Sequence, residues 1–251
     1  MEGRLFNFHS GSRILIRVAA AIAITLSTMA PAAQAAPIIT FTPGSDFGYV
    51  PAANHGITPI TKGSATIFNY NVPAFEYAGE TWTRVGMAVN GYVIVGGGDE
   101  GDAPNRSLPD AGGPTNILAP FWTDDYEADE MRIAGMQSGA RAWIVMEWSG
   151  TYSFQVWLLY SSVGEGEGIT FTYSNSSDWS SLPANLTIGA QDKTGTVGTN
   201  WYYNGSGNEI QDIRLRSSEL PVVTVPEPAT LLLLAGGVGM ILRPRGRRAD
   251  A

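Results

Sequence analysis

The chain has no cysteine and only two histidines among its 251 residues. The missing cysteines exclude disulfides, thiolate metal ligands and a cysteine nucleophile, and are compatible with an exported chain that uses no disulfides. His9 lies in the first 35 residues, which resemble a removable signal, so His55 is the one histidine left for the rest of the chain. A Ser-His-Asp triad would depend on His55 alone, and no Gly-x-Ser-x-Gly turn presents a nucleophile.

Basic residues are also scarce, at 15 against 23 acidic residues, and seven of the 15 lie near the two ends. Residues 36–225 therefore keep eight basic and twenty acidic residues, which gives this part a net charge of −12. A surface of that charge repels polyphosphate, so the composition argues against nucleic acid as a partner.

No segment of the middle shows a sustained helical period; short β-branched and aromatic runs are separated instead by glycine, proline and asparagine. Asn90-Gly91 predicts a type I′ turn between strands over 82–89 and 92–95. Residues 142–148, 154–160 and 169–173 predict three consecutive antiparallel strands, and 186–191, 200–203 and 210–215 three more. We therefore expect residues 36–220 to form one all-β domain, an antiparallel two-sheet β-sandwich.

Residues 1–35 have the pattern of a secretory signal helix: a basic start, an apolar stretch over 18–29 and a small-x-small site. Ala33 and Ala35 are the small residues, so cleavage is expected before Ala36. An uncleaved anchor is the alternative, but the apolar stretch is short and a cleavage site follows it. The pattern implies passage through the export machinery and signal peptidase.

The carboxyl end contains three segments in a fixed order. A linker over 221–228 ends in Val225, Pro226, Glu227 and Pro228, whose prolines stop any strand arriving from upstream. An apolar segment over 229–242 predicts a short transmembrane helix, although its 14 residues fall below the roughly 20 that usually span a bilayer. The basic tail, 243–251, resists crossing a membrane and contains Arg243, Arg245, Arg247 and Arg248.

This order of motif, apolar segment and arginines resembles the sorting signal of PEP-CTERM proteins, which exosortase-type membrane enzymes are thought to process. The resemblance implies export, at least transient anchoring in the inner membrane, and delivery to the cell envelope, outer surface or extracellular matrix of a Gram-negative bacterium. Matrix polysaccharide is the partner class that the resemblance suggests. A plain membrane anchor with a basic cytoplasmic stub is the alternative.

A second resemblance lies within residues 75–215. Asn90-Gly91-Tyr92, Asn116 to Trp122 with Asp124, Glu147-Trp148, Phe154 to Val156, Ile169 to Phe171 and Gly189 occur in an order similar to that of nidogen-like and other secreted bacterial β-modules. Such modules usually have an acidic residue directly after the tryptophan, whereas this chain has Thr123 there. The family is associated with adhesion and matrix attachment rather than with a reaction.

Two acidic loops offer oxygen ligands for a hard cation, with Asp99, Asp102, Asp124 and Asp125 as candidates for Ca²⁺. A solvated acidic loop with no ion is the alternative, and no other cofactor is expected.

Paired carboxylates would also serve a glycoside hydrolase, for which mid-strand Glu147 is the residue of interest. Pairing of Glu147 with an arginine such as Arg141, or exposure to water, is the simpler expectation. Trp179 and the Trp201-Tyr202-Tyr203 run could stack on sugars, although aromatic residues in a sandwich usually fill the core. We therefore expect a non-enzymatic exported protein with a structural or adhesive role, and a secreted carbohydrate-active hydrolase is the alternative.

Overall fold

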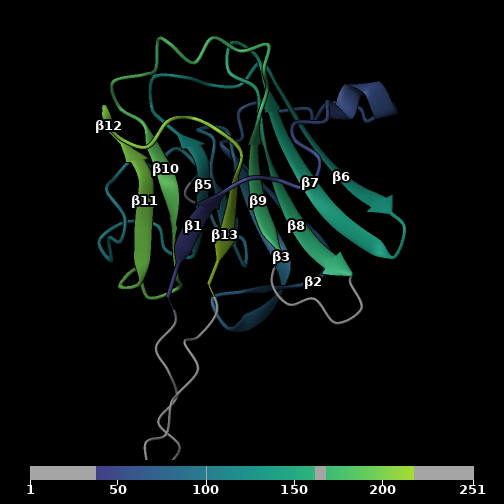
Figure 1. Cartoon of the computed structure of the whole chain (residues 1–251), viewed down its shortest axis with the longest axis horizontal. Helices are drawn as coiled ribbons and strands as arrows, with labels where there is room; N and C mark the ends of the chain where they lie inside the picture. The colour runs from purple at the N-terminus through teal and green to yellow at the C-terminus, as the bar shows by residue number, and fades with distance from the viewer. Residues whose placement is uncertain (1–37, 100, 162–167, 218–251) are drawn as a thin grey trace, which may run out of the picture. The chain divides into compact units, whose positions relative to one another are not determined.

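The computed structural model describes residues 38–99, 101–161 and 168–217, all within the compact unit Ala36–Pro221 (Figure 1). These residues form two antiparallel sheets and one short 3₁₀ helix, η1 (Ala52–His55), which confirms the predicted all-β sandwich. The signal helix and transmembrane helix expected over 1–35 and 229–242 lie outside this part. Within it, no helix has the length and apolar character needed to span a membrane.

The two sheets contain six and seven strands. The six-stranded sheet has the order β1 (Thr40–Pro43), β13 (Ile213–Arg216), β9 (Ile169–Tyr173), β8 (Phe154–Ser161), β7 (Arg141–Ser149), β6 (Glu130–Ser138). The seven-stranded sheet has the order β12 (Ser206–Gly207), β11 (Gly198–Tyr203), β10 (Thr187–Gln191), β5 (Ile117–Trp122), β4 (Val93–Val95), β3 (Glu80–Ala88), β2 (Ile67–Tyr77). The strand pairs in the described part of the chain are antiparallel, and β7, β8 and β9 are neighbours as the sequence predicts.

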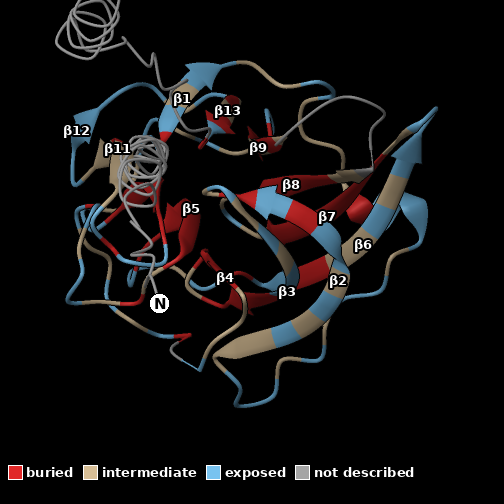
Figure 2. Cartoon of the chain, turned by 90° about the horizontal axis from the view of Figure 1, so that it is seen from below, coloured by how far each residue is buried: buried red, intermediate tan, exposed pale blue. Residues whose placement is uncertain are grey.

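The main core lies between the sheets, and strand alternation decides which side chains enter it. On β7, Ile144, Met146 and Trp148 face the core, whereas Trp143 and Val145 belong to a separate cluster on the outer face of the six-stranded sheet. The buried strands appear red in Figure 2. Burial of each large apolar side chain in the core stabilises the fold by about 1.5–3 kcal/mol.

Asn90-Gly91 does connect two strands, but the predicted type I′ turn is wrong. A type I′ turn needs positive φ at both central residues, and only Gly91 of this pair has it (φ 82°). The connection is longer, closed by a hydrogen bond from Ala88 N to Tyr92 O of 2.9 Å. Its backbone also bonds to β5 and the residue after it: Phe121 N donates to Gly91 O, and Thr123 N donates to Asn90 O.

Two turns elsewhere do have the type I′ signature. Ala78 and Gly79 (φ 52° and 77°) join β2 to β3, and Asn204 and Gly205 (φ 43° and 83°) join β11 to β12.

The sequence pattern does not predict β2 or β6. Asn69, Asn71 and Pro73 interrupt the alternation on β2, which is an edge strand with a register shift between Asn71 and Phe75. A proline is tolerated at such an edge because its missing N–H is not needed by a neighbouring strand. On β6, the buried Arg132 occupies an outward position where a polar residue normally indicates solvent.

Candidate functional site

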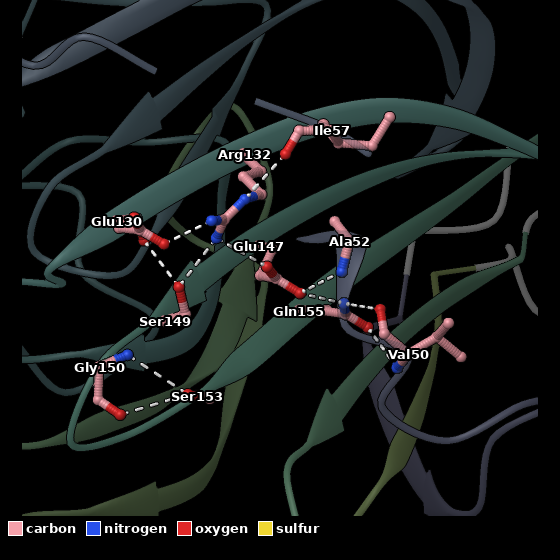
Figure 3. A network of polar contacts seen from close by, with 10 residues as sticks. All are labelled: Val50, Ala52, Ile57, Glu130, Arg132, Glu147, Ser149, Gly150, Ser153 and Gln155. Atoms are coloured by element: carbon pink, nitrogen blue, oxygen red, sulfur yellow. Dashed lines mark hydrogen bonds and ion pairs between the residues drawn. The ribbon is translucent and has the colours of Figure 1, made fainter. Parts of the chain in front are cut away.

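The outer face of the six-stranded sheet is covered in part by residues 44–57, here called the covering segment. Trp143, Val145, Trp157 and Leu159 form an apolar cluster on that face, and Val50 of the covering segment packs against it. Beside the cluster, the covering segment is bound to the sheet by a network of polar side chains (Figure 3).

Glu147 is at the centre of the polar network and is only 1% exposed. Its Oε2 accepts hydrogen bonds from Ala52 N at 2.9 Å and from Gln155 Nε2 at 2.7 Å, while Arg132 Nη1 lies 3.3 Å from Oε1. Arg132 also donates from Nε to the Ile57 carbonyl oxygen at 3.0 Å. The Glu147 carboxylate thus holds the covering segment on the sheet.

The arginine suggested as a partner for Glu147 is corrected by this geometry. Arg132 lies directly across from Glu147 in the β6–β7 register, whereas Arg141 lies on the same strand as Glu147 and pairs with Asp46. Glu147 does pair with an arginine, as the sequence suggests, but Arg141 as the example and exposure to water are both wrong. Cross-strand neighbours lie closer than residues six positions apart on one strand, which is the reason for the correction.

Gln155 supplies the second attachment of the covering segment. Its Oε1 accepts a hydrogen bond from Val50 N at 3.2 Å, and its Nε2 donates to Val50 O at 2.5 Å. Trp157 Nε1 also donates to Gln155 Oε1 at 2.9 Å. The adjacent Tyr49 is partly buried, and burial, followed by the negative charge of Glu147, raises the pKa of its hydroxyl. The covering segment is therefore fixed by both backbone and side-chain contacts.

The same face also contains a cavity of about 300 Å³. We call it the arginine pocket; among its lining residues are Asp46, Arg141, Trp143, Thr170, Arg214 and Arg216. Arg141 Nη1 lies 3.0 Å from Asp46 Oδ2, and Arg214 Nη2 contacts Asp46 Oδ1. No sequence pattern indicates this site, because its arginines come from β7 and β13, about 70 residues apart in the chain.

The acidic candidates for Ca²⁺ are all exposed. Asp124 Oδ1 accepts a hydrogen bond from Asn105 N at 3.3 Å, and partial burial raises the pKa of this carboxyl group. Asp125 Oδ2 accepts one from Asn185 N at 3.4 Å. Within the described ranges, no three acidic, histidine or cysteine residues gather as a metal site would require. The remaining candidates, Asp99 and Asp102, lie between β4 and β5.

Three of the aromatic residues considered as a sugar platform, Trp179, Trp201 and Tyr202, pack in or against the core. Trp201 is 8% exposed, and its Nε1 donates to Glu209 O at 2.8 Å. Trp179 is half-buried, stacks on Tyr152 with ring centroids 5.6 Å apart, and packs edge-on against Phe121. Core filling is therefore the role that the geometry assigns to both tryptophans.

The residues predicted for sorting and processing lie outside the described ranges: Ala33, Ala35, Ala36, Val225, Pro226, Glu227, Pro228, Arg243, Arg245, Arg247 and Arg248. The folded part is a two-sheet β-sandwich with a covered polar network and an adjacent arginine pocket. No protein-family model, no curated protein and no solved structure matches the chain.

Proposed function

We propose that this chain is an exported, non-enzymatic protein of the cell envelope or extracellular matrix of a Gram-negative bacterium, with a structural or adhesive role. The observation that carries the proposal is the order Val225 to Pro228, apolar 229–242, and the arginines from Arg243 onward. The prolines stop regular backbone pairing before the membrane, the apolar segment enters it, and the arginines hold the far end on the cytoplasmic side. The resemblance to PEP-CTERM proteins suggests that an exosortase-type enzyme then processes this segment.

The length of the apolar segment supports a temporary anchor. At about 1.5 Å per residue, 14 residues give a helix of about 21 Å, shorter than the roughly 30 Å hydrocarbon core. Gly236, Gly237 and Gly239 each weaken a helix by about 1 kcal/mol relative to alanine in water. A short, glycine-containing span fits a segment that is held only until it is cut.

The chemistry of the folded domain favours binding over hydrolysis. The strand carboxylate with the best position for catalysis, Glu147, accepts hydrogen bonds from Ala52 N and Gln155 Nε2 and faces Arg132. Because it is buried under the covering segment, it serves that segment's attachment. The sandwich, together with the association of PEP-CTERM-like sorting with exopolysaccharide producers, supports matrix polysaccharide as the partner.

Cell fractionation with and without the motif tests the proposed sorting. The full chain with Pro226→Ala and Pro228→Ala is expected to accumulate uncut in the inner membrane, whereas wild type is recovered shortened in the envelope or medium. Pro221→Ala, which alters a proline outside the motif, is the matched control and is expected to behave as wild type. Intact wild-type chain in the cytosol, or a reporter fused after Arg248 that reaches the periplasm, would refute the proposal.

A further inference from the structure

We propose that the arginine pocket binds a sugar residue that carries a carboxylate or sulfate, and is thereby the site at which this protein holds an acidic polysaccharide. The polymer as ligand depends on the proposed function above. The anionic chemistry depends only on the pocket. No residue lining the pocket belongs to the hydrogen-bond network around Glu147, although Asp46 of the covering segment is one of the lining residues.

Positive charge is concentrated at this cavity. Residues 36–225 contain only eight basic residues, and three of them, Arg141, Arg214 and Arg216, line this one cavity. Among the described lining residues the one carboxylate is Asp46, so these residues carry two net positive charges in a domain of net charge −12. Three arginines on one cavity of an acidic protein favour an anionic ligand.

Two of the three arginines, Arg141 and Arg214, are held in place before any ligand arrives. Asp46 contacts both Arg141 and Arg214, and Arg141 also lies over the ring of Trp143 at 5.7 Å. That ring is in turn packed edge-on by Phe47, with centroids 5.0 Å apart. Preorganised donors lose less conformational entropy on binding than free side chains do.

The loop that carries Asp46 is itself fixed. Ser45 Oγ donates to Asp212 Oδ2 at 2.5 Å, and Gly48 N donates to Ser45 Oγ at 2.9 Å. The other oxygen of Asp212, Oδ1, accepts from Tyr173 N at 2.9 Å, which attaches this loop to the end of β9. The position of Asp46 is therefore set by the sheet.

Guanidinium N–H donors of Arg214 and Arg216 remain available to a ligand. Arg214 contacts Asp46 through Nη2, and no carboxylate in the described part of the chain pairs with Arg216. A guanidinium has five N–H donors arranged as a planar fork that matches a carboxylate, and sulfate offers similar oxygens. Thr170, next to Arg214 in the β9–β13 register, adds a hydroxyl group among the lining residues.

The size of the pocket selects a small group on a polymer. A volume of about 300 Å³ lies at the lower end of the range for ligand pockets. The net charge of the whole domain opposes a polyanion at long range, but screening limits this repulsion to a Debye length of about 8 Å at physiological salt. Recognition of one acidic sugar at a time is consistent with both facts.

Binding of the purified full chain to defined saccharides tests the inference. The probes are oligogalacturonate, the same oligosaccharide with its carboxylates reduced to alcohols, dextran sulfate and neutral dextran. Arg216→Gln and Arg214→Gln are the test variants, and Arg84→Gln is the matched control, since it removes an exposed arginine on β3. Arg216 makes no ion pair within the described residues, so Arg216→Gln should leave the stability of the domain unchanged. Equal Tm values for the variant and the wild type verify this.

We expect oligogalacturonate or dextran sulfate to bind the wild-type chain and Arg84→Gln alike. Loss of a charge-assisted hydrogen bond in either test variant should raise Kd about tenfold or more. Comparison of the two acidic probes identifies the anionic group. Equal binding of the carboxyl-reduced or neutral sugar, equal Kd in test and control variants, tighter binding of single-stranded DNA, or equally strong competition by sodium acetate or sulfate would each overturn the inference.

The two proposals can fail separately. If wild type is sorted and cut as expected but binds neither acidic saccharide, the assignment of the pocket is wrong and the proposed sorting stands. If the chain stays in the cytosol yet binds an acidic saccharide through Arg214 and Arg216, the sorting is wrong and the pocket stands.

Discussion

Replacement of Arg132 by methionine is a direct test of the buried network that holds the covering segment. Methionine keeps most of the apolar stem but removes the guanidinium, which contacts Glu147 Oε1 at 3.3 Å and Ser149 Oγ at 3.2 Å. The side chains of Arg132 and Glu147 are 7% and 1% exposed, so water cannot solvate the Glu147 carboxylate once the guanidinium is gone. Glu147 is then left as a buried carboxylate that keeps only its neutral donors.

The expected cost follows from that burial. Removal of one partner of a buried ion pair costs about 3–5 kcal/mol, because the other charge is left uncompensated. Typical domains have a total stability of about 5–15 kcal/mol, so the loss is a large share of it. Arg132→Met combined with Glu147→Gln removes both charges, and the amide retains a carbonyl oxygen for Ala52 N or Gln155. We therefore expect the double variant to recover about 1–3 kcal/mol relative to the sum of the single changes.

Urea unfolding followed by tryptophan fluorescence measures these free energies. All seven tryptophans lie between residues 82 and 201, so the signal reports the β-domain alone. Lys193→Met is the control, because its pair with Glu80 is exposed (55% and 41%) and should contribute about 0–1 kcal/mol.

The reasoning is wrong if Arg132→Met costs no more than Lys193→Met. It is also wrong if the double variant is less stable than the two single losses added together. Either result would mean that the ion pair between Arg132 and Glu147 is not a main attachment of the covering segment.

Two further predictions concern the backbone and the alkaline limit of stability. Gly91 has φ 82°, and a Cβ at this position would lie 2.1 Å from Phe121 O, so Gly91→Ala should lower the free energy of unfolding in urea by about 2–5 kcal/mol. Gly205→Ala, at a similar φ but with open space, should cost only about 1–2 kcal/mol, and equal costs would contradict the steric argument. Burial raises the pKa of Tyr173 well above its ordinary value of 10.0, so its contribution to stability is complete below about pH 10 and is lost above it. Unfolding free energy should fall there by up to about 1.4 kcal/mol per pH unit, and Tyr173→Phe should reduce that slope; an unchanged slope would refute the assignment.

Strands with clear alternation could be predicted from the sequence, because period-two patterns report which face is buried. The segment from Trp143 to Trp148 is an example: its two sets of alternating residues lie on opposite faces of β7. The pattern fails where the type of a residue does not match its position in the fold. Pro73 lies in the edge strand β2 although proline disfavours strands, and Arg132 is buried on β6 although it is charged. The type I′ prediction for Asn90-Gly91 is wrong for a different reason. The backbone oxygens of these residues accept hydrogen bonds from Phe121 N and Thr123 N, which are distant in the chain.

The candidate sites divide in the same way. Motifs contiguous in the chain, such as Val225 to Pro228 with the segments that follow, can be read from the sequence because a processing enzyme or a membrane meets them as linear segments. The arginine pocket is not contiguous, since Asp46, Arg141 and Arg214 meet only when β7 and β13 join one sheet.

By itself, then, the sequence determined the composition, the excess of acid, the strand-forming segments and the linear signals at the two ends, all of which depend on residues near one another in the chain. Tertiary structure decided that Glu147 pairs with Arg132 rather than Arg141, and that three arginines line one cavity. The physical reason is that strand register and sheet order set distances between residues far apart in the chain, and charge interactions depend on those distances.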